Sequence, residues 1–96
     1  MSVLIVGVID VQNPADLGPY KEAMAVSMQE FGIAMVGQAR PTEMLEGEFS
    51  GTFTAILEIE SEEKARAWHA SDSYAKAIAA RSKDAKFSIA IVPKAA

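Results

Sequence analysis

The sequence predicts a single domain of the α+β class, in which two helices cover one face of a four-stranded antiparallel sheet. Four short stretches have the apolar runs or the alternation typical of strands, at residues 3–11, 33–40, 52–60 and 86–93. Two longer stretches, one after the first strand and one after the third, space their apolar residues as amphipathic helices do. A length of 96 residues suits one domain, residues 1–96, and not two.

The first strand is expected to have both faces covered. Residues 3–11 are Val-Leu-Ile-Val-Gly-Val-Ile-Asp-Val, and almost no polar side chain alternates with the apolar ones. A single layer of helices covers only one face of a sheet. We therefore expect a second copy of the chain to cover the other face, so that the protein forms a homodimer.

The first helix is expected at residues 19–31. Asn13 before Pro14 is a candidate cap of the preceding turn, and Pro19 suits a first helical position because its missing N–H costs no hydrogen bond there. Gly32 then ends the helix, as glycine commonly does. The stripe at helical spacing contains Tyr20, Met24, Ser27, Met28 and Phe31.

Alternation is clearest in the third strand, which follows a connection at residues 41–51. One of its faces carries Phe53, Ala55, Leu57 and Ile59. The second helix begins at the N-cap Ser61 and runs to about residue 83, and Ser71-Asp72-Ser73 marks either a kink or a newly capped start. Its expected buried residues are Ala65, Trp68, Ala75, Ile78 and Ala79. Strand 86–93 and a tail at 93–96 complete the chain.

The order β-α-β-β-α-β is that of the ferredoxin-like fold, and right-handed crossovers place both helices on the same face of the sheet. Parity then predicts which side chains lie on the helix-free face: Leu4, Val6, Val8, Asp10, Thr52, Thr54, Ile56 and Glu58. Its apolar members suit contact with the sheet of a second copy. Its polar members would line whatever space remains between the two sheets.

Composition narrows the function classes. A formal net charge of −4 disfavours nucleic acid and anionic membranes as partners. The absence of cysteine excludes disulfides and cysteine nucleophiles, and with a single histidine no metal site is expected. The apolar run is too short for a membrane span and no basic leader precedes it, so a cytoplasmic location is expected. No P-loop or dinucleotide-type glycine cluster occurs, so no cofactor is expected.

Several motifs spread along the chain resemble one family. They are Asp10-Val11 before Asn13-Pro14, Pro19-Tyr20-Lys21-Glu22, Leu45-Glu46-Gly47-Glu48-Phe49, Ala67-Trp68-His69, Ser71-Asp72-Ser73-Tyr74 and the later Arg81. With them the chain resembles the proteins called domain of unknown function 1330, in the dimeric α/β-barrel superfamily. The resemblance implies a ferredoxin-like protomer, a homodimer and no established activity. The chain departs from the family pattern at His69, where tyrosine is usual.

Two residues are the catalytic candidates. His69 is the only histidine, and histidine is the side chain that changes charge between pH 5 and 8 without help. It could act as an acid or base at a cavity rim, paired with Glu46 or Glu58, or it could be a half-exposed helical histidine without a role. Arg40 ends a strand and could hold a substrate carboxylate in a bidentate manner, or form an ordinary ion pair with a glutamate.

Aromatic and acidic residues complete the candidate ligand site. Trp68 and Tyr74 could stack on a ligand, although aromatic side chains more often pack in the core. Arg81 shares a helix face with Tyr74, and this pair could bind an anion, face solvent or form a salt bridge in the dimer. Glu46 is either functional or part of a turn at Gly47. The residues expected to bind a ligand are Asp10, Arg40, Glu46, Glu58, Trp68 and Tyr74.

Three functional interpretations follow. The first is a homodimeric α/β-barrel protein that binds a small organic molecule in a cavity beside the sheet. The second is a cofactor-independent enzyme similar to the monooxygenases and isomerases that share this barrel, with His69 as base and Arg40 stabilising an oxyanion. The third is a structural or interaction module without a pocket. A cavity of at least about 300 Å³ with convergent polar groups would favour ligand binding.

Overall fold

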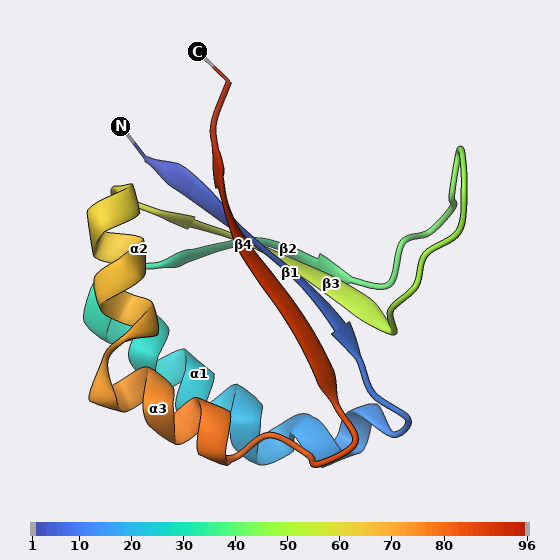
Figure 1. Ribbon diagram of the computed structural model, residues 1–96, viewed down its shortest axis with the longest axis horizontal. Coiled ribbons are helices and arrows are strands. Elements are labelled where there is room, and N and C mark those ends of the chain that lie inside the picture. Colours follow the sequence, from blue (N-terminus) through green and yellow to red (C-terminus); the bar gives the residue numbers. More distant parts are fainter. Residues whose placement is uncertain (1, 96) are drawn as a thin grey trace.

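The helices of the protein lie on one side of a single four-stranded antiparallel sheet, as the computed structural model shows (Figure 1). The structure describes residues 2–95, so the last residue of the predicted tail lies outside the described residues. The elements in chain order are β1 (Val3–Asp10), the short 3-10 helix η1 (Pro14–Leu17), α1 (Gly18–Phe31), β2 (Ala34–Ala39), β3 (Phe53–Ile59), α2 (Glu62–His69), α3 (Asp72–Ala79) and β4 (Lys86–Pro93). The strand order β2-β3-β1-β4 confirms the predicted ferredoxin-like fold.

The two faces of the sheet follow the predicted parity. On β1, Ile5 and Ile9 point toward the helices and are only 2% and 4% exposed. Val6 lies on the opposite face, where it pairs with Ile56 of β3 and Ala90 of β4. Within residues 2–95 no helix covers this second face, so partly exposed apolar side chains form its centre.

Helix α1 carries the stripe that the sequence predicts. Tyr20 and Ser27 are buried, and Gly32 closes the helix with φ of 65°, donating its N–H to Gln29 O. The turn before α1, predicted only as a turn, forms the 3-10 helix η1. Asn13 caps η1 by accepting a hydrogen bond from the backbone of Ala15, which confirms its capping role.

The second predicted helix is two helices, because Ser71 caps a new one. Its hydroxyl oxygen accepts a hydrogen bond from the backbone N–H of Tyr74, at the start of α3. The new axis resets the helical phase, so the buried residues of α3 are Tyr74 and Ala77. The expected burial of Ala75, Ile78 and Ala79 was wrong for this reason, since all three are exposed, and α3 also ends before residue 83.

The connection between β2 and β3 extends away from the body of the sheet (Figure 1). Its turn at Gly47 has φ of 73°, which confirms the predicted role of this glycine. Leu45 in the same connection is 88% exposed. None of the helices among residues 2–95 has the length and apolar character needed to cross a membrane.

Candidate functional site

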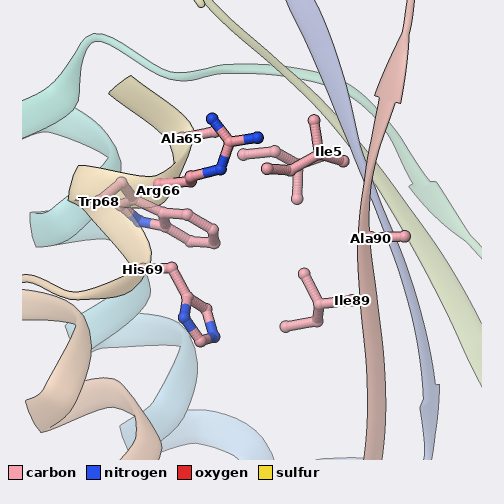
Figure 2. A pocket seen from close by; sticks show the side chains of 8 residues that line it. Ile5, Ala65, Arg66, Trp68, His69, Ile89 and Ala90 are labelled. Carbon is pink, nitrogen blue, oxygen red and sulfur yellow. The ribbon is translucent and has the colours of Figure 1, made fainter. Parts of the chain in front are cut away.

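A groove of about 340 Å³ lies between α2 and the sheet, over β1 and the edge strand β4 (Figure 2). Its walls are mainly apolar and come from Ile5, Ala65, Trp68, Ile89, Ala90 and Ile91. The polar side chains at its rim are Arg66 and His69, which project from α2 toward the strands in Figure 2. The groove lies on the helix side of the sheet and is formed by residues of a single chain.

Trp68 is the fixed wall of this groove. Its indole N–H donates to the hydroxyl of Ser27 on α1 at 3.1 Å, and both side chains are buried. The ring of Tyr74 packs against it, with centroids 4.3 Å apart. Because a buried indole N–H needs a partner, this hydrogen bond fixes the orientation of the ring that a ligand would meet.

His69 lies at the mouth of the groove, where it is exposed. Its ring is 5.3 Å from that of Tyr74 and 6.2 Å from that of Trp68, measured between centroids. Arg66, one turn earlier on α2, donates to Glu62 at 3.3 Å, yet its side chain is 65% exposed. An exposed ion pair of this kind is weak, so the guanidinium group remains available to a ligand.

A smaller cavity of about 30 Å³ lies behind the groove, between the sheet and the helices. It shares Ile5, Trp68 and Ile89 with the groove and is otherwise bounded by residues that include Tyr20 and Met24. A further groove of about 340 Å³ between α1 and β2 also contacts Tyr20 and Met24. The space between the two layers is therefore incompletely filled across its width.

Arg81 lies within a cluster of aromatic rings beside this space. Its guanidinium carbon is 3.9 Å from the centroid of the Phe87 ring, and its Nη2 donates to the Tyr74 hydroxyl at 2.7 Å. Among the described residues nothing accepts a hydrogen bond from its buried Nε. Burial, followed by the proximity of Tyr74, raises the pKa of the nearby Tyr20 hydroxyl above its ordinary value.

The predicted acidic residues lie away from the groove. Glu58 lies on the helix-free face and accepts hydrogen bonds from Ser2 at 2.6 Å and Lys94 at 3.0 Å. These contacts, with Ser2 the larger cause, lower the pKa of the Glu58 carboxyl. Asp10 is exposed at the other end of β1, where the Thr52 hydroxyl is 3.4 Å from its carboxylate.

The two candidates from the β2–β3 connection also lie outside the groove. Arg40 and Glu46 are exposed, and neither belongs to the residues that line it. The structure thus brings together Trp68, His69 and Tyr74 from the predicted set, and separates them from Arg40, Glu46, Glu58 and Asp10.

Arg66 is the rim residue that sequence reasoning missed. It precedes His69 by three residues, which places both side chains on the same face of one helix. That spacing was visible in the sequence, but nothing there showed that this face of α2 borders an open groove. Within residues 2–95 no group of three or more histidine or acidic side chains could hold a metal ion.

Comparison with known proteins places the fold and the family. The model of the family described as Domain of unknown function (DUF1330) matches residues 2–95. No protein with a curated description matches the chain. A crystal structure of a protein of unknown function from Rhodopseudomonas palustris is similar, with a TM-score of 0.74 and 14% identity over 99% of this chain and 83% of that one.

A second crystal structure, of a dimeric ferredoxin-like protein of unknown function from Thermobifida fusca, has a TM-score of 0.57. The identity is 11%, over 96% of this chain and 92% of that one. These likenesses independently support the four-stranded ferredoxin-like architecture. Because the family model covers residues 2–95, the chain belongs to the DUF1330 family.

Proposed function

We propose that this protein binds a small organic molecule in the groove between α2 and the strands β1 and β4. The observation that carries the proposal is the construction of the groove: an apolar floor with two polar side chains, Arg66 and His69, at its rim. Sites for small molecules are typically concave, mostly apolar and equipped with a few placed polar groups. The volume of about 340 Å³ lies at the small end of the range for such sites.

A ligand screen with two readouts tests the proposal. Trp68 is the only tryptophan and forms a wall of the groove, so its fluorescence reports on occupancy. A compound at about one hundred times its dissociation constant should also stabilise the fold by about 2.7 kcal/mol in thermal unfolding. If no compound in a broad library of small acids, amines and neutral aromatics changes either signal, the proposal fails.

We further propose that the protein is a homodimer joined through the helix-free faces of two sheets. The central side chains of that face are apolar, among them Val6, Val8 and Ile56. A contiguous apolar patch of this kind on a small domain is typical of an interface. The similar protein from Thermobifida fusca is described as dimeric, which agrees with this assembly. The proposed ligand groove lies on the opposite side and would stay open in such a dimer.

A second candidate function is cofactor-independent catalysis with His69 as general base. The observation in its favour is that the only histidine lines the groove beside an arginine. A base at the rim of an apolar site, with a cation beside it for a developing negative charge, suits proton abstraction from an activated carbon. Arg66 lines the groove and is near His69 in sequence, whereas Arg40 does not line it, so Arg66 is the better candidate for this cation. Loss of turnover in both His69→Ala and His69→Gln would support this function. Full activity in both variants would refute it.

A further inference from the structure

We infer that the groove selects amphipathic monocarboxylic acids, with the carboxylate held between Arg66 and His69 and the apolar body against Trp68 and Ile89. This inference rests on the proposed binding function and names its ligand class. It comes from an asymmetry in the lining: the charged or chargeable side chains at the rim are basic, and the remaining lining residues are apolar.

The basic rim is unusual for this chain. Acidic residues outnumber lysine and arginine by 13 to 9 over the whole sequence, yet no acidic side chain is among the described residues that line the groove. Its two polar side chains lie one turn apart on α2; in Figure 2 Arg66 reaches toward Ile5, and the His69 ring lies farther along the groove, across from Ile89. The planar guanidinium group of an arginine suits the two oxygens of a carboxylate better than it suits an amine or a neutral amide.

The groups around His69 favour this ligand charge. Its ring lies against the rings of Trp68 and Tyr74, and the other polar side chain that lines the groove is Arg66. Glu62, one turn before Arg66 on α2, pairs with the guanidinium group at 3.3 Å. A bound carboxylate would therefore compete with Glu62 for the guanidinium group.

The floor of the groove suits an apolar chain or ring. Ile5, Trp68 and Ile89 line both the groove and the smaller cavity behind it, so an apolar tail that follows them stays in contact with apolar side chains. A ligand that is charged at both ends would place its second charge against this apolar floor, without a partner. We therefore expect one anionic group and not two.

Matched probes test the inference on the full chain. Octanoate, octanamide and octylamine share an apolar tail and differ in the charge of the head group, and Trp68 fluorescence with calorimetry measures their dissociation constants. We expect octanoate to bind about tenfold more tightly than octanamide at low salt, and octylamine to bind most weakly. Because the rim is exposed, this preference should shrink as the ionic strength rises.

Three variants locate the head group. Arg66→Gln should bring octanoate and octanamide to within about threefold of each other, because the charged donor is lost. Glu62→Gln should strengthen octanoate binding, because it frees the guanidinium group from its competitor. His69→Gln should weaken octanoate binding more than octanamide binding, because a basic side chain at the rim is lost. Circular dichroism checks that each exposed substitution leaves the fold intact.

Three outcomes overturn the inference without touching the proposed function. Equal binding of all three probes would show an apolar groove without charge selection. Tight octanoate binding that neither Arg66→Gln nor His69→Gln weakens would place the carboxylate elsewhere. A library in which amines or neutral compounds bind and octanoate does not would also refute the ligand class, whereas a library without any binder refutes the proposed function itself.

Discussion

The indole N–H of Trp68 donates a hydrogen bond to the hydroxyl of Ser27, and this contact joins α2 to α1 inside the helix layer. Ser27 is the buried polar residue of the core and is fully enclosed. Its hydroxyl also donates to the backbone carbonyl of Met24 at 2.8 Å. The Ser27 hydroxyl therefore accepts a hydrogen bond from α2 and donates one to a backbone carbonyl of its own helix, α1.

Ser27→Ala should destabilise the protein by about 1–3 kcal/mol, because it leaves the buried Trp68 N–H without an acceptor. Urea unfolding followed by Trp68 fluorescence measures the change. The matched control is Ser50→Ala, at an exposed position of the β2–β3 connection, which should change the stability by less than about 0.5 kcal/mol. Equal stabilities of wild type and Ser27→Ala would show that the hydrogen bond contributes nothing.

The Tyr74–Arg81 contact gives a second prediction. Tyr74→Phe removes the acceptor for Arg81 Nη2 beside an Nε that already lacks one, and should cost about 1.5–3 kcal/mol. In an Arg81→Met background the same change should cost at least about 1 kcal/mol less, since the donor is gone. A double-mutant cycle of unfolding free energies measures this coupling. Additive effects of the two substitutions would mean that the contact contributes nothing to the free energy of unfolding.

The sequence predicted the architecture because each element carries its own local signal. Alternation predicted the faces of β3, parity extended that assignment to β1, and Gly32 and Ser61 marked the end of one helix and the start of another. The phase of α3 was mispredicted because Ser71 restarts the helix, and a periodicity extended from Trp68 cannot include a change of axis.

The candidate site was predictable only in part, for a different reason. Trp68, His69 and Tyr74 are near in sequence, so the chain itself brings them together. The groove that Trp68 and His69 line depends on how far α2 stands from β4, and no local pattern encodes that separation. Arg66 was missed because its importance comes from this groove and not from any motif.

Charging the helix-free face should dissociate the proposed dimer. Val6→Asp places a carboxylate at the centre of that face, and we expect the mass in light scattering at micromolar concentration to fall to that of one chain. Val26→Asp is the matched control: Val26 is 62% exposed on α1, and the same substitution there should leave the mass unchanged. Ile56→Asp should repeat the effect of Val6→Asp. A monomeric wild type would contradict the proposed assembly.

Glu58 should make stability depend on pH in the acid range. Hydrogen bonds from Ser2 and then Lys94 lower the pKa of its carboxyl in the folded state. Its contribution is therefore fully present above the unfolded-state pKa of about 4.3 and is lost as the pH falls through the lower folded-state pKa. The difference in unfolding free energy between wild type and Glu58→Gln should narrow from pH 7 toward pH 3. A difference that stays constant with pH would contradict this role of Glu58. Glu48→Gln, in the exposed β2–β3 connection, serves as the control.

Tyr20 should make the protein sensitive to alkali. Burial raises the pKa of its hydroxyl, so the folded chain keeps the phenol neutral at a pH where the unfolded chain ionises it. The resulting stability is fully present below the unfolded-state pKa of about 10 and declines above it as the pH rises toward the folded-state value. Tyr20→Phe removes this ionisation from both states. The unfolding free energy of this variant, measured by urea titration from pH 8 to pH 11, should therefore fall less steeply than that of the wild type. Parallel curves would show that Tyr20 ionises as readily in the folded protein as in the unfolded chain.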